Sequence, residues 1–380
     1  MVLTRRAHRA RMLITRWLPN EVLVEIIRHS PPPDWVALCR VSKLFHALTL
    51  PTLLRAVHLD METPDKVASF CHSVIHNPER VGHIRTMRLI NKEHHDARLW
   101  HYDLLMDTLQ LMQQLETFHF TEYREVTTQK ILLRLGSLTF PHLKTLYVLH
   151  SHRHLHDSTL RDFVNRHPRL TQLILWEPDT HPGYDWVGIC LPNLRQYQGT
   201  GRPNFLLALY PHILTGAWLF WFPSANPDHV FEPLKRLTHS HQPFVLSNDF
   251  ILWDDDEVLR CLVSASSHMP WITSLRMRSW EVEETGTTAI RNIKIELSKF
   301  THLIYLALDF HGSGHNSESV VNAFGDQHKA VATWGNVCAT LKACLTGDTA
   351  WRKVGEDWEV YPKDEFEAEA GFSELVETFF

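Results

Sequence analysis

The chain has 380 residues, of which 44% are hydrophobic and 21% are charged, and its formal net charge at pH 7 is −5. These values are typical of a globular chain with one large or two smaller domains, and the negative charge argues against general nucleic-acid binding. No apolar run reaches the ~18 residues that a membrane span requires. We therefore expect neither nucleic acid nor a membrane among the partners.

The first 16 residues contain five arginines and no acidic residue, and they lack the continuous apolar stretch of a secretory signal. We expect residues 1–16 to form a basic flexible tail, with a transit peptide or a weak nuclear-import signal as alternatives. The six cysteines include no C-x-x-C pair, which indicates free thiols in a reducing compartment. The sequence therefore predicts a cytoplasmic and/or nuclear protein.

Residues 17–59 combine helix signals with many apolar side chains. An L-P pair precedes a first helix in which apolar residues recur every three to four positions. Three prolines, Pro31 to Pro33, end this helix; Asp34 can cap a longer second helix, which Pro51 ends before a third short helix. A three-helix unit this small, with so many apolar residues, indicates a docking surface.

Two stretches of this segment, L-P-x-E-V and D-W-V-A-L-C-R-V-S-K-L-F-H-A-L, resemble the F-box, the docking module of substrate receptors in SCF-type ubiquitin ligases. The resemblance implies that residues 17–59 bind a Skp-type adaptor and, through it, a cullin ligase. It implies that the adaptor-binding residues are Leu18, Pro19, Val22, Ile26, Leu38, Val41 and Leu44. The alternative is that these apolar residues pack locally and only cap the rest of the chain.

After this segment, a phrase of the form apolar-x-x-apolar-x-apolar recurs at intervals of 24 to 31 residues, interrupted by one longer gap. A period of this length is typical of a solenoid, and the alternation that ends each phrase predicts a strand with one buried face. The phrase begins at Ile84, Leu115, Leu143, Leu170, Leu194, Ile272 and Leu303.

Helical patterns lie between these phrases. Alternating strands and helices predict an α/β fold, with a parallel sheet lined by helices and curved like a horseshoe. We assign residues 60–346 to this irregular solenoid. It resembles leucine-rich-repeat proteins, although the Asn or Cys expected after the strand is missing from most units. The layout resembles F-box receptors that are common in mushroom-forming fungi. The predicted helices occupy residues 99–114, begin at Asp157 and Asp254, and run from Ile290 to Phe300 and from Val331 to Leu345.

Two segments depart from the repeat. Residues 205–250 contain the aromatic run FLLALYPHILTGAWLFWF, which we interpret as a buried repeat of unreadable register; an exposed aromatic patch for a partner is the alternative. Residues 347–380 predict a hairpin around Gly355 to Asp357 that caps the solenoid. The acidic tail that follows either docks back as an amphipathic helix or is a disordered partner motif.

Catalytic motifs are absent from the sequence, which has no P-loop, G-x-S-x-G or H-E-x-x-H pattern. We therefore expect no enzymatic activity, no cofactor and no bound metal. The acidic run Asp254 to Asp256 fits a helix N-terminus better than a magnesium site. Alternate histidines on an extended segment could share one face and bind a metal, but surface-loop histidines are the preferred interpretation. These are His150, His152, His154 and His156, with His94 and His95 as a smaller pair.

Four tryptophans fall at or just past strand ends, where the rim of a horseshoe protein contacts partners. They are Trp176, Trp186, Trp253 and Trp280, and burial in the core is the equal alternative for each. The predicted function is a non-catalytic substrate receptor that binds an unknown target protein on the solenoid. The alternatives are a repeat scaffold without a ligase role and a metal-dependent enzyme built around the histidine cluster.

Overall fold

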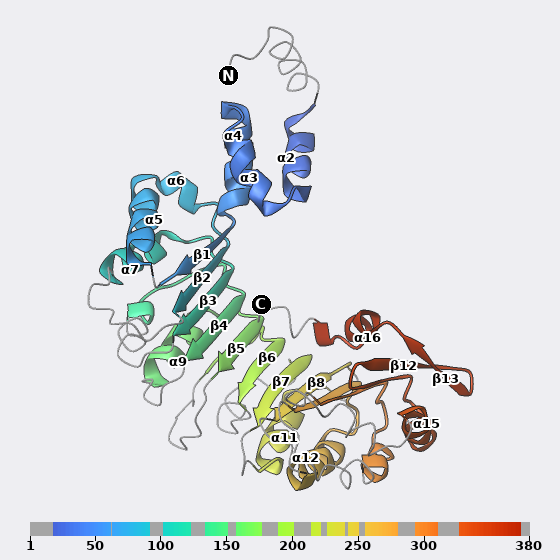
Figure 1. Cartoon of the computed structure of the whole chain (residues 1–380). Helices are drawn as coiled ribbons and strands as arrows, with labels where there is room; N and C mark the ends of the chain where they lie inside the picture. Colours follow the sequence, from blue (N-terminus) through green and yellow to red (C-terminus); the bar gives the residue numbers. More distant parts are fainter. Residues whose placement is uncertain are drawn as a thin grey trace. The chain divides into compact units, whose positions relative to one another are not determined.

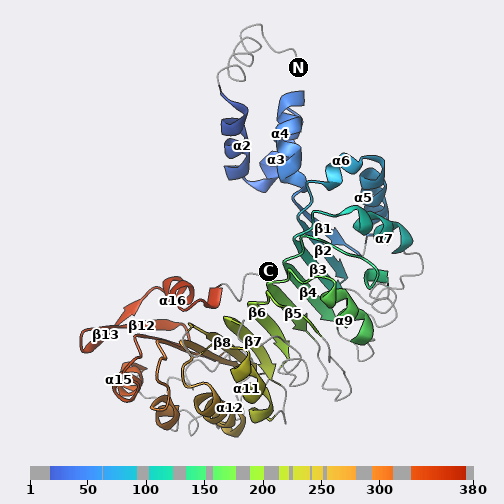
Figure 2. The same cartoon turned by 180° about the vertical axis from the view of Figure 1, so that it is seen from behind.

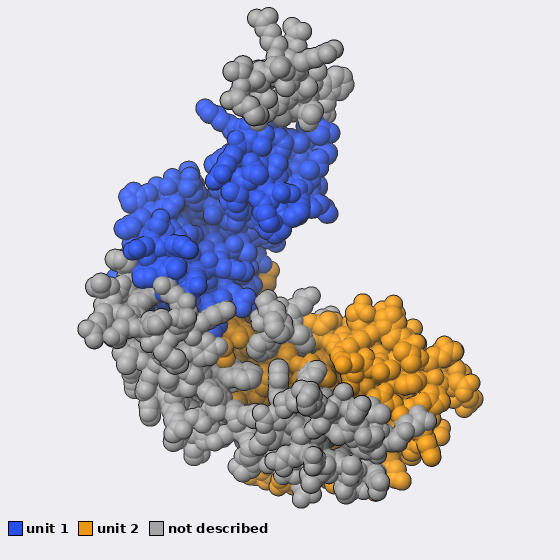
Figure 3. Space-filling view, in the orientation of Figure 1, with its two compact units in different colours: residues 1–122, 137–143 blue, residues 123–136, 144–380 orange. Residues whose placement is uncertain are grey.

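The computed structural model describes residues 18–61, 63–91, 102–122, 134–150, 157–176, 189–200, 214–221, 226–239, 242–250, 255–279, 293–310 and 327–373. The chain divides into two compact units (Figure 3), residues 1–122 with 137–143 and residues 123–136 with 144–380. Within each unit the strands follow one another in chain order, β1 to β3 in the first and β4 to β13 in the second (Figure 1).

The described part of the first unit begins with three short helices, α2 (Asn20–His29), α3 (Pro32–Cys39) and α4 (Lys43–Leu54). Its three strands pair in parallel, with Leu59 opposite Leu89 and Leu89 opposite Phe120, so that one row of buried side chains crosses them. The further elements are β1 (Ala56–Asp60), α5 (Pro64–His76), α6 (Pro78–Val81), β2 (Thr86–Asn91), α7 (Tyr102–Leu111) and β3 (Thr117–Glu122).

The second unit is a sheet whose strands β4 to β11 pair in parallel, whereas β12 and β13 are antiparallel to their neighbours. Its strands are β4 (Thr145–His150), β5 (Gln172–Trp176), β6 (Gln196–Thr200), β7 (Gly216–Trp221), β8 (Val245–Phe250), β9 (Ser274–Ser279), β10 (Tyr305–Phe310), β11 (Ala343–Thr346), β12 (Thr349–Val354) and β13 (Asp357–Tyr361). Its helices are α9 (Asp157–Asn165), α11 (Asp228–Arg236), α12 (Asp255–His268), α15 (Gln327–Val337) and α16 (Lys363–Glu369).

The two faces of this sheet differ in what covers them, because alternate strand residues point to opposite sides. One side, which we call the α11 face, carries Trp221, whose ring lies 5.6 Å from that of Phe231 in α11. A row of leucines in register, Leu246, Leu275 and Leu306, is completely buried on this face. Each such leucine contributes roughly 1.5–3 kcal/mol through burial.

The opposite side, which we call the α16 face, is covered in part by helix α16. The hairpin β12–β13 shows both sides: Trp358 lies against Gly335 of α15, whereas Tyr361 lies 6.3 Å from Phe366 of α16. In Figures 1 and 2, α16 accordingly lies across the sheet from α11, α12 and α15.

Threonines link neighbouring strands of the second unit, each just before its own strand begins. The hydroxyl groups of Thr171, Thr215 and Thr273 donate to main-chain carbonyls that directly precede the neighbouring strand, at 3.2, 3.2 and 2.9 Å. The main-chain N–H of each threonine donates to the same carbonyl. These bonds extend the links between the strands beyond the strand ladder itself.

The seven strands predicted from the recurring phrase are present as β2 to β6, β9 and β10, and the parallel pairing was also predicted correctly. A hairpin lies at the predicted place, and all six cysteines are free. Within residues 205–250, the described strand β7 is buried at all six positions, so its aromatic side chains form no exposed patch.

Three details of the sequence prediction were wrong. Residues 34–48 do not form one helix: α3 ends at Cys39, α4 begins after Ser42, and Pro51 lies inside α4. Asp34 lies in the first turn of α3, since the helix begins at Pro32. The last predicted helix ends at Val337, and Leu345 belongs to strand β11 instead.

Candidate functional site

The helix α2 has an inward and an outward apolar side. Leu23 and Ile27 are buried, whereas Val22 and Ile26 are 41% and 49% exposed. Because residues three and four apart share a helix face, these two pairs form separate stripes on α2. The inward stripe supplies the core of the helical group, and the outward stripe places apolar surface in water.

The sequence fixes the ends of these helices by local bonds. The Trp35 Nε1–H group donates to the carbonyl of Ile27 at 2.8 Å, which ties α3 to the end of α2. Ser42 caps α4, its hydroxyl accepting from the main-chain N–H of Phe45 at 3.2 Å. Both α2 and α3 contact α4, so the three helices pack as one group.

The seven residues predicted to bind an adaptor are all accessible in the structure. Pro19, Val22, Ile26 and Val41 are exposed, and Leu18, Leu38 and Leu44 are half-buried. Val36 of α3, which sequence reasoning did not single out, is exposed as well. A signal was present, since Val36 is an apolar residue of the D-W-V-A-L stretch that resembles an F-box. An accessible set of aliphatic side chains of this kind can bind another apolar surface.

Charge contributes little to this surface. Glu25 and Arg28 form an ion pair at 2.6 Å, but both side chains are 55% exposed, and such pairs add at most about 1 kcal/mol. The exposed aliphatic side chains therefore dominate this surface.

A second site, which is polar, lies on the α16 face of the second unit. Asp249, Arg278 and Asp309 occupy register positions across three adjacent strands. The Arg278 Nε atom lies 3.2 Å from Asp309, and its Nη1 atom lies 3.9 Å from Asp249. Burial raises the pKa of the Asp249 carboxyl to about 7, and the nearby guanidinium of Arg278 opposes this rise. The site is a row of paired charges across the three strands.

Arg276 lies one row away and is completely buried. Its Nη2 atom lies 2.8 Å from Glu367 of α16, and its guanidinium lies over the ring of Phe372, 4.2 Å from the ring centre. Sequence reasoning missed these arginines and aspartates. A signal was present, since the phrases VLSNDF, LRMRS and YLALDF place charged residues on the strand side opposite the leucines.

Several predicted site residues are not placed by the structure. Trp176 ends strand β5, and nothing is described of its side chain; Trp186, Trp253 and Trp280 lie outside the described residues. His150 ends strand β4, and the remaining cluster and pair, His152, His154, His156, His94 and His95, lie outside the described residues, as does Asp254. Asp255 and Asp256 begin α12.

Within the described ranges, no three His, Cys, Asp or Glu side chains are grouped so that they could hold a metal ion. None of the helices in that part of the chain has the length and apolar character needed to span a membrane.

A comparison with protein families matches residues 17–60 to the F-box-like family. The match covers the three helices α2 to α4 and strand β1, which are the elements that carry the exposed aliphatic residues. No curated protein matches the chain. The chain thus contains an F-box-like domain at residues 17–60. This domain is followed by an α/β region, in which helices alternate with the strands of a mixed sheet.

Proposed function

We propose that the protein is a non-catalytic substrate receptor of an SCF-type ubiquitin ligase. Domains of the F-box-like type generally bind Skp-type adaptors, and residues 17–60 match this family. The observation that carries the proposal is that Val22, Ile26 and Val41 of this domain are exposed. In the complex, these side chains lie against the adaptor, which links the chain to a cullin.

The exposure of these residues also separates the proposal from its main alternative. If the helices only capped a repeat scaffold, the outward stripe of α2 would be expected to lie against the first repeat. The inward stripe, Leu23 and Ile27, already supplies the packing that the helical group needs. The outward residues Val22 and Ile26 have no such packing role, which favours a partner in trans.

In this proposal the body binds the target. We propose that residues 60–346 form a degenerate leucine-rich-repeat-like solenoid, as in the F-box receptors of mushroom-forming fungi. The parallel strands and the links made by Thr171, Thr215 and Thr273 support a repeat architecture. The domain boundaries and a cytoplasmic or nuclear location are part of the same proposal.

The mechanism is proximity. A target held on the body while the F-box-like helices are docked meets the activated ubiquitin at a high effective concentration. The residues of this chain need only bind, and the ligase partners supply the chemistry. The two alternatives, a repeat scaffold and a metal-dependent enzyme around His150 to His156, lack a comparable observation in their favour.

The test is a calorimetric titration of the full chain with a purified Skp-type adaptor. We expect one adaptor to bind per chain and the double variant Val22→Asp/Val41→Asp to weaken binding by at least about 30-fold, since charges replace apolar contacts. The matched control is Val360→Asp, which changes a valine that is 63% exposed on β13 of the other unit. A folded chain that binds no adaptor contradicts the proposal.

A further inference from the structure

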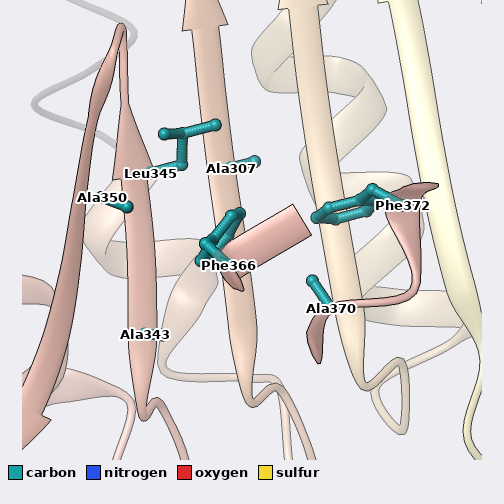
Figure 4. Close-up of a cluster of buried hydrophobic side chains, with 7 residues drawn as sticks. All are labelled: Ala307, Ala343, Leu345, Ala350, Phe366, Ala370 and Phe372. Atoms are coloured by element: carbon teal, nitrogen blue, oxygen red, sulfur yellow. The ribbon is translucent and has the colours of Figure 1, made fainter. Parts of the chain in front are cut away.

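The end of the described chain packs onto the α16 face as a compact plug, residues 363–373. Phe366 and Phe372 are completely buried there, in a cluster with Ala307, Leu345 and neighbouring side chains (Figure 4). The ring of Phe366 meets that of Tyr305 edge-on at 6.0 Å and that of Phe372 at 6.1 Å. Two phenylalanines therefore anchor the plug.

Charge complements these anchors. Glu367 pairs with Arg276, and Glu369 pairs with Arg352 of strand β12. Arg276 also stacks on the Phe372 ring, so one guanidinium contacts both an acidic and an aromatic side chain of the plug. The face thus contacts the plug through both its acidic and its aromatic side chains.

The plug takes no part in the pairing of the strands. Strands β10 to β13 pair with one another without it, and α16 has seven residues. A helix this short is not stable alone, so its structure depends on docking. Gly371 has a φ of +76°, a left-handed conformation that suits glycine and lets the chain turn between Ala370 and Phe372. The plug has the features of a bound peptide that happens to be covalently attached.

The face beneath and beside the plug has hydrogen-bonding capacity that the plug does not use. The Nε atom of Arg276 and the hydroxyl of Ser247, its neighbour across the strands, are buried without a hydrogen-bond partner. In the same row, both amide atoms of Gln198 are buried and lack partners. Such groups carry an energetic cost that a better-matched ligand would remove.

Space for a longer ligand adjoins the plug. A pocket of about 420 Å³ lies beside Gly371 and Val245 on the same side of the sheet. Its lining combines polar residues with apolar ones and includes Arg195, Gln196, Thr215 and Gln242 as well as Gly216, Pro243 and Val245. A segment that replaced the plug could continue past its phenylalanine into this pocket.

We propose that residues 363–373 occupy, in cis, the site at which the α16 face binds an acidic, phenylalanine-containing segment of a target protein. The target segment must displace the plug, which therefore acts as a built-in competitor. This inference rests on the proposed function, because it names the class of target that the receptor body binds.

The experiment is a fluorescence-polarisation titration of the full chain with a labelled peptide of residues 363–373. We expect the peptide to bind weakly, because the attached plug occupies the site most of the time. Glu367→Lys in the full chain breaks the pair with Arg276 and should tighten binding of the wild-type peptide by about tenfold, since the site is then open more often. Glu365→Lys is the control, because Glu365 lies on the same helix but is exposed; it should leave binding unchanged.

A second pair of measurements uses substituted peptides, which do not affect the fold of the chain. Against the Glu367→Lys chain, a peptide with Phe372→Ala should bind about 30-fold more weakly than the wild-type peptide, and one with Glu365→Lys should bind equally well. If no chain binds the peptide, or if Glu367→Lys leaves its affinity unchanged, the plug is a structural cap and the inference is wrong. Titration of the same samples with the adaptor tests the proposed function separately. If the adaptor binds but the peptide does not, only the inference about the plug is wrong.

Discussion

Ile26 and Ile27 are neighbours in α2, yet Ile26 is 49% exposed and Ile27 is completely buried. The same residue type thus has two different roles at successive positions of one helix. Ile27 holds the helical group together, and in the proposed complex Ile26 contacts the adaptor.

This pair predicts a clean separation of stability from binding. Ile27→Ala should lower the free energy of unfolding by about 2–5 kcal/mol, because it leaves a cavity in the helical group. Ile26→Ala should change that free energy by less than about 0.5 kcal/mol and should still weaken adaptor binding. Urea unfolding and adaptor titration of both variants provide the check. Equal loss of stability in the two would show that Ile26 is part of the core.

A buried histidine makes stability depend on pH. His167 donates from Nδ1 to the carbonyl of Phe163 at 2.6 Å, and burial lowers its pKa from 6.5 to about 4. Between these values the unfolded chain binds a proton that the folded chain does not, so stability falls as the pH falls through this window. His167→Gln should cost stability at pH 7.5, and this cost should shrink by up to about 1.4 kcal/mol per pH unit towards pH 4.5.

His76 provides the matched control for that measurement. It makes the same bond to the carbonyl four residues earlier, His72, at 2.7 Å, but its side chain is exposed. His76→Gln therefore measures how much stability is lost when this type of bond is removed at an exposed position. A constant stability difference for His167→Gln across the same window would mean that His167 titrates normally in the folded chain.

The two carboxylates beside Arg278 should respond in opposite ways to neutralisation. The pKa of Asp249 is raised from 3.8 to about 7, mainly by burial, so its stability contribution declines as the pH rises from about 4 to 7. Asp249→Asn should therefore gain stability relative to the parent chain between pH 5 and pH 8, by the order of 1 kcal/mol.

Asp309→Asn should instead destabilise the chain throughout that range. Asp309 is the nearer partner of Arg278, at 3.2 Å from Nε, and its removal leaves the largely buried guanidinium with the weaker pair. Denaturant unfolding of the two variants at pH 5 and pH 8 tests both statements. The assignment fails if the variants change stability in the same direction at pH 8.

Gly335 should be intolerant of alanine although it lies in a helix. A Cβ atom there would lie 2.5 Å from Cζ2 of Trp358. Alanine normally stabilises a helix by about 1 kcal/mol over glycine, but this contact should reverse the sign and cost about 1–3 kcal/mol. Thermal unfolding in the Trp358→Leu background should show a smaller cost, because the ring is gone; an equal cost in both backgrounds would place the strain elsewhere.

Much of this fold could be predicted because its signals are local. The recurring apolar phrase identified seven strands, since each strand buries one side and spaces its leucines by two. The strands β7 and β8 could not be placed in register because β7 is buried at every position and β8 at all but one, so the alternation disappears. Pro51 was interpreted as a helix end, but packing of α4 against α2 and α3 overrides the lost hydrogen bond.

The two candidate sites also differ in whether their signals are local in the sequence. The F-box-like segment was identified from sequence because the order and spacing of its residues along α2, α3 and α4 are local properties. The pairing of Arg276 with Glu367 depends on strand β9 and helix α16, which only the folded sheet brings together. No pattern within either segment specifies its partner. The sequence therefore predicted the docked helix only as one of two alternatives for the acidic tail, the other being a disordered partner motif.

The measurement that tests the central claim most directly is amide hydrogen exchange of the full chain with and without a Skp-type adaptor. We expect adaptor binding to slow exchange in residues 18–54, which include α2, α3 and α4, and to leave strands β4 to β13 unchanged. Unchanged exchange in these helices at saturating adaptor, or slowed exchange confined to the second unit, would contradict the assignment of the F-box-like domain as the docking site.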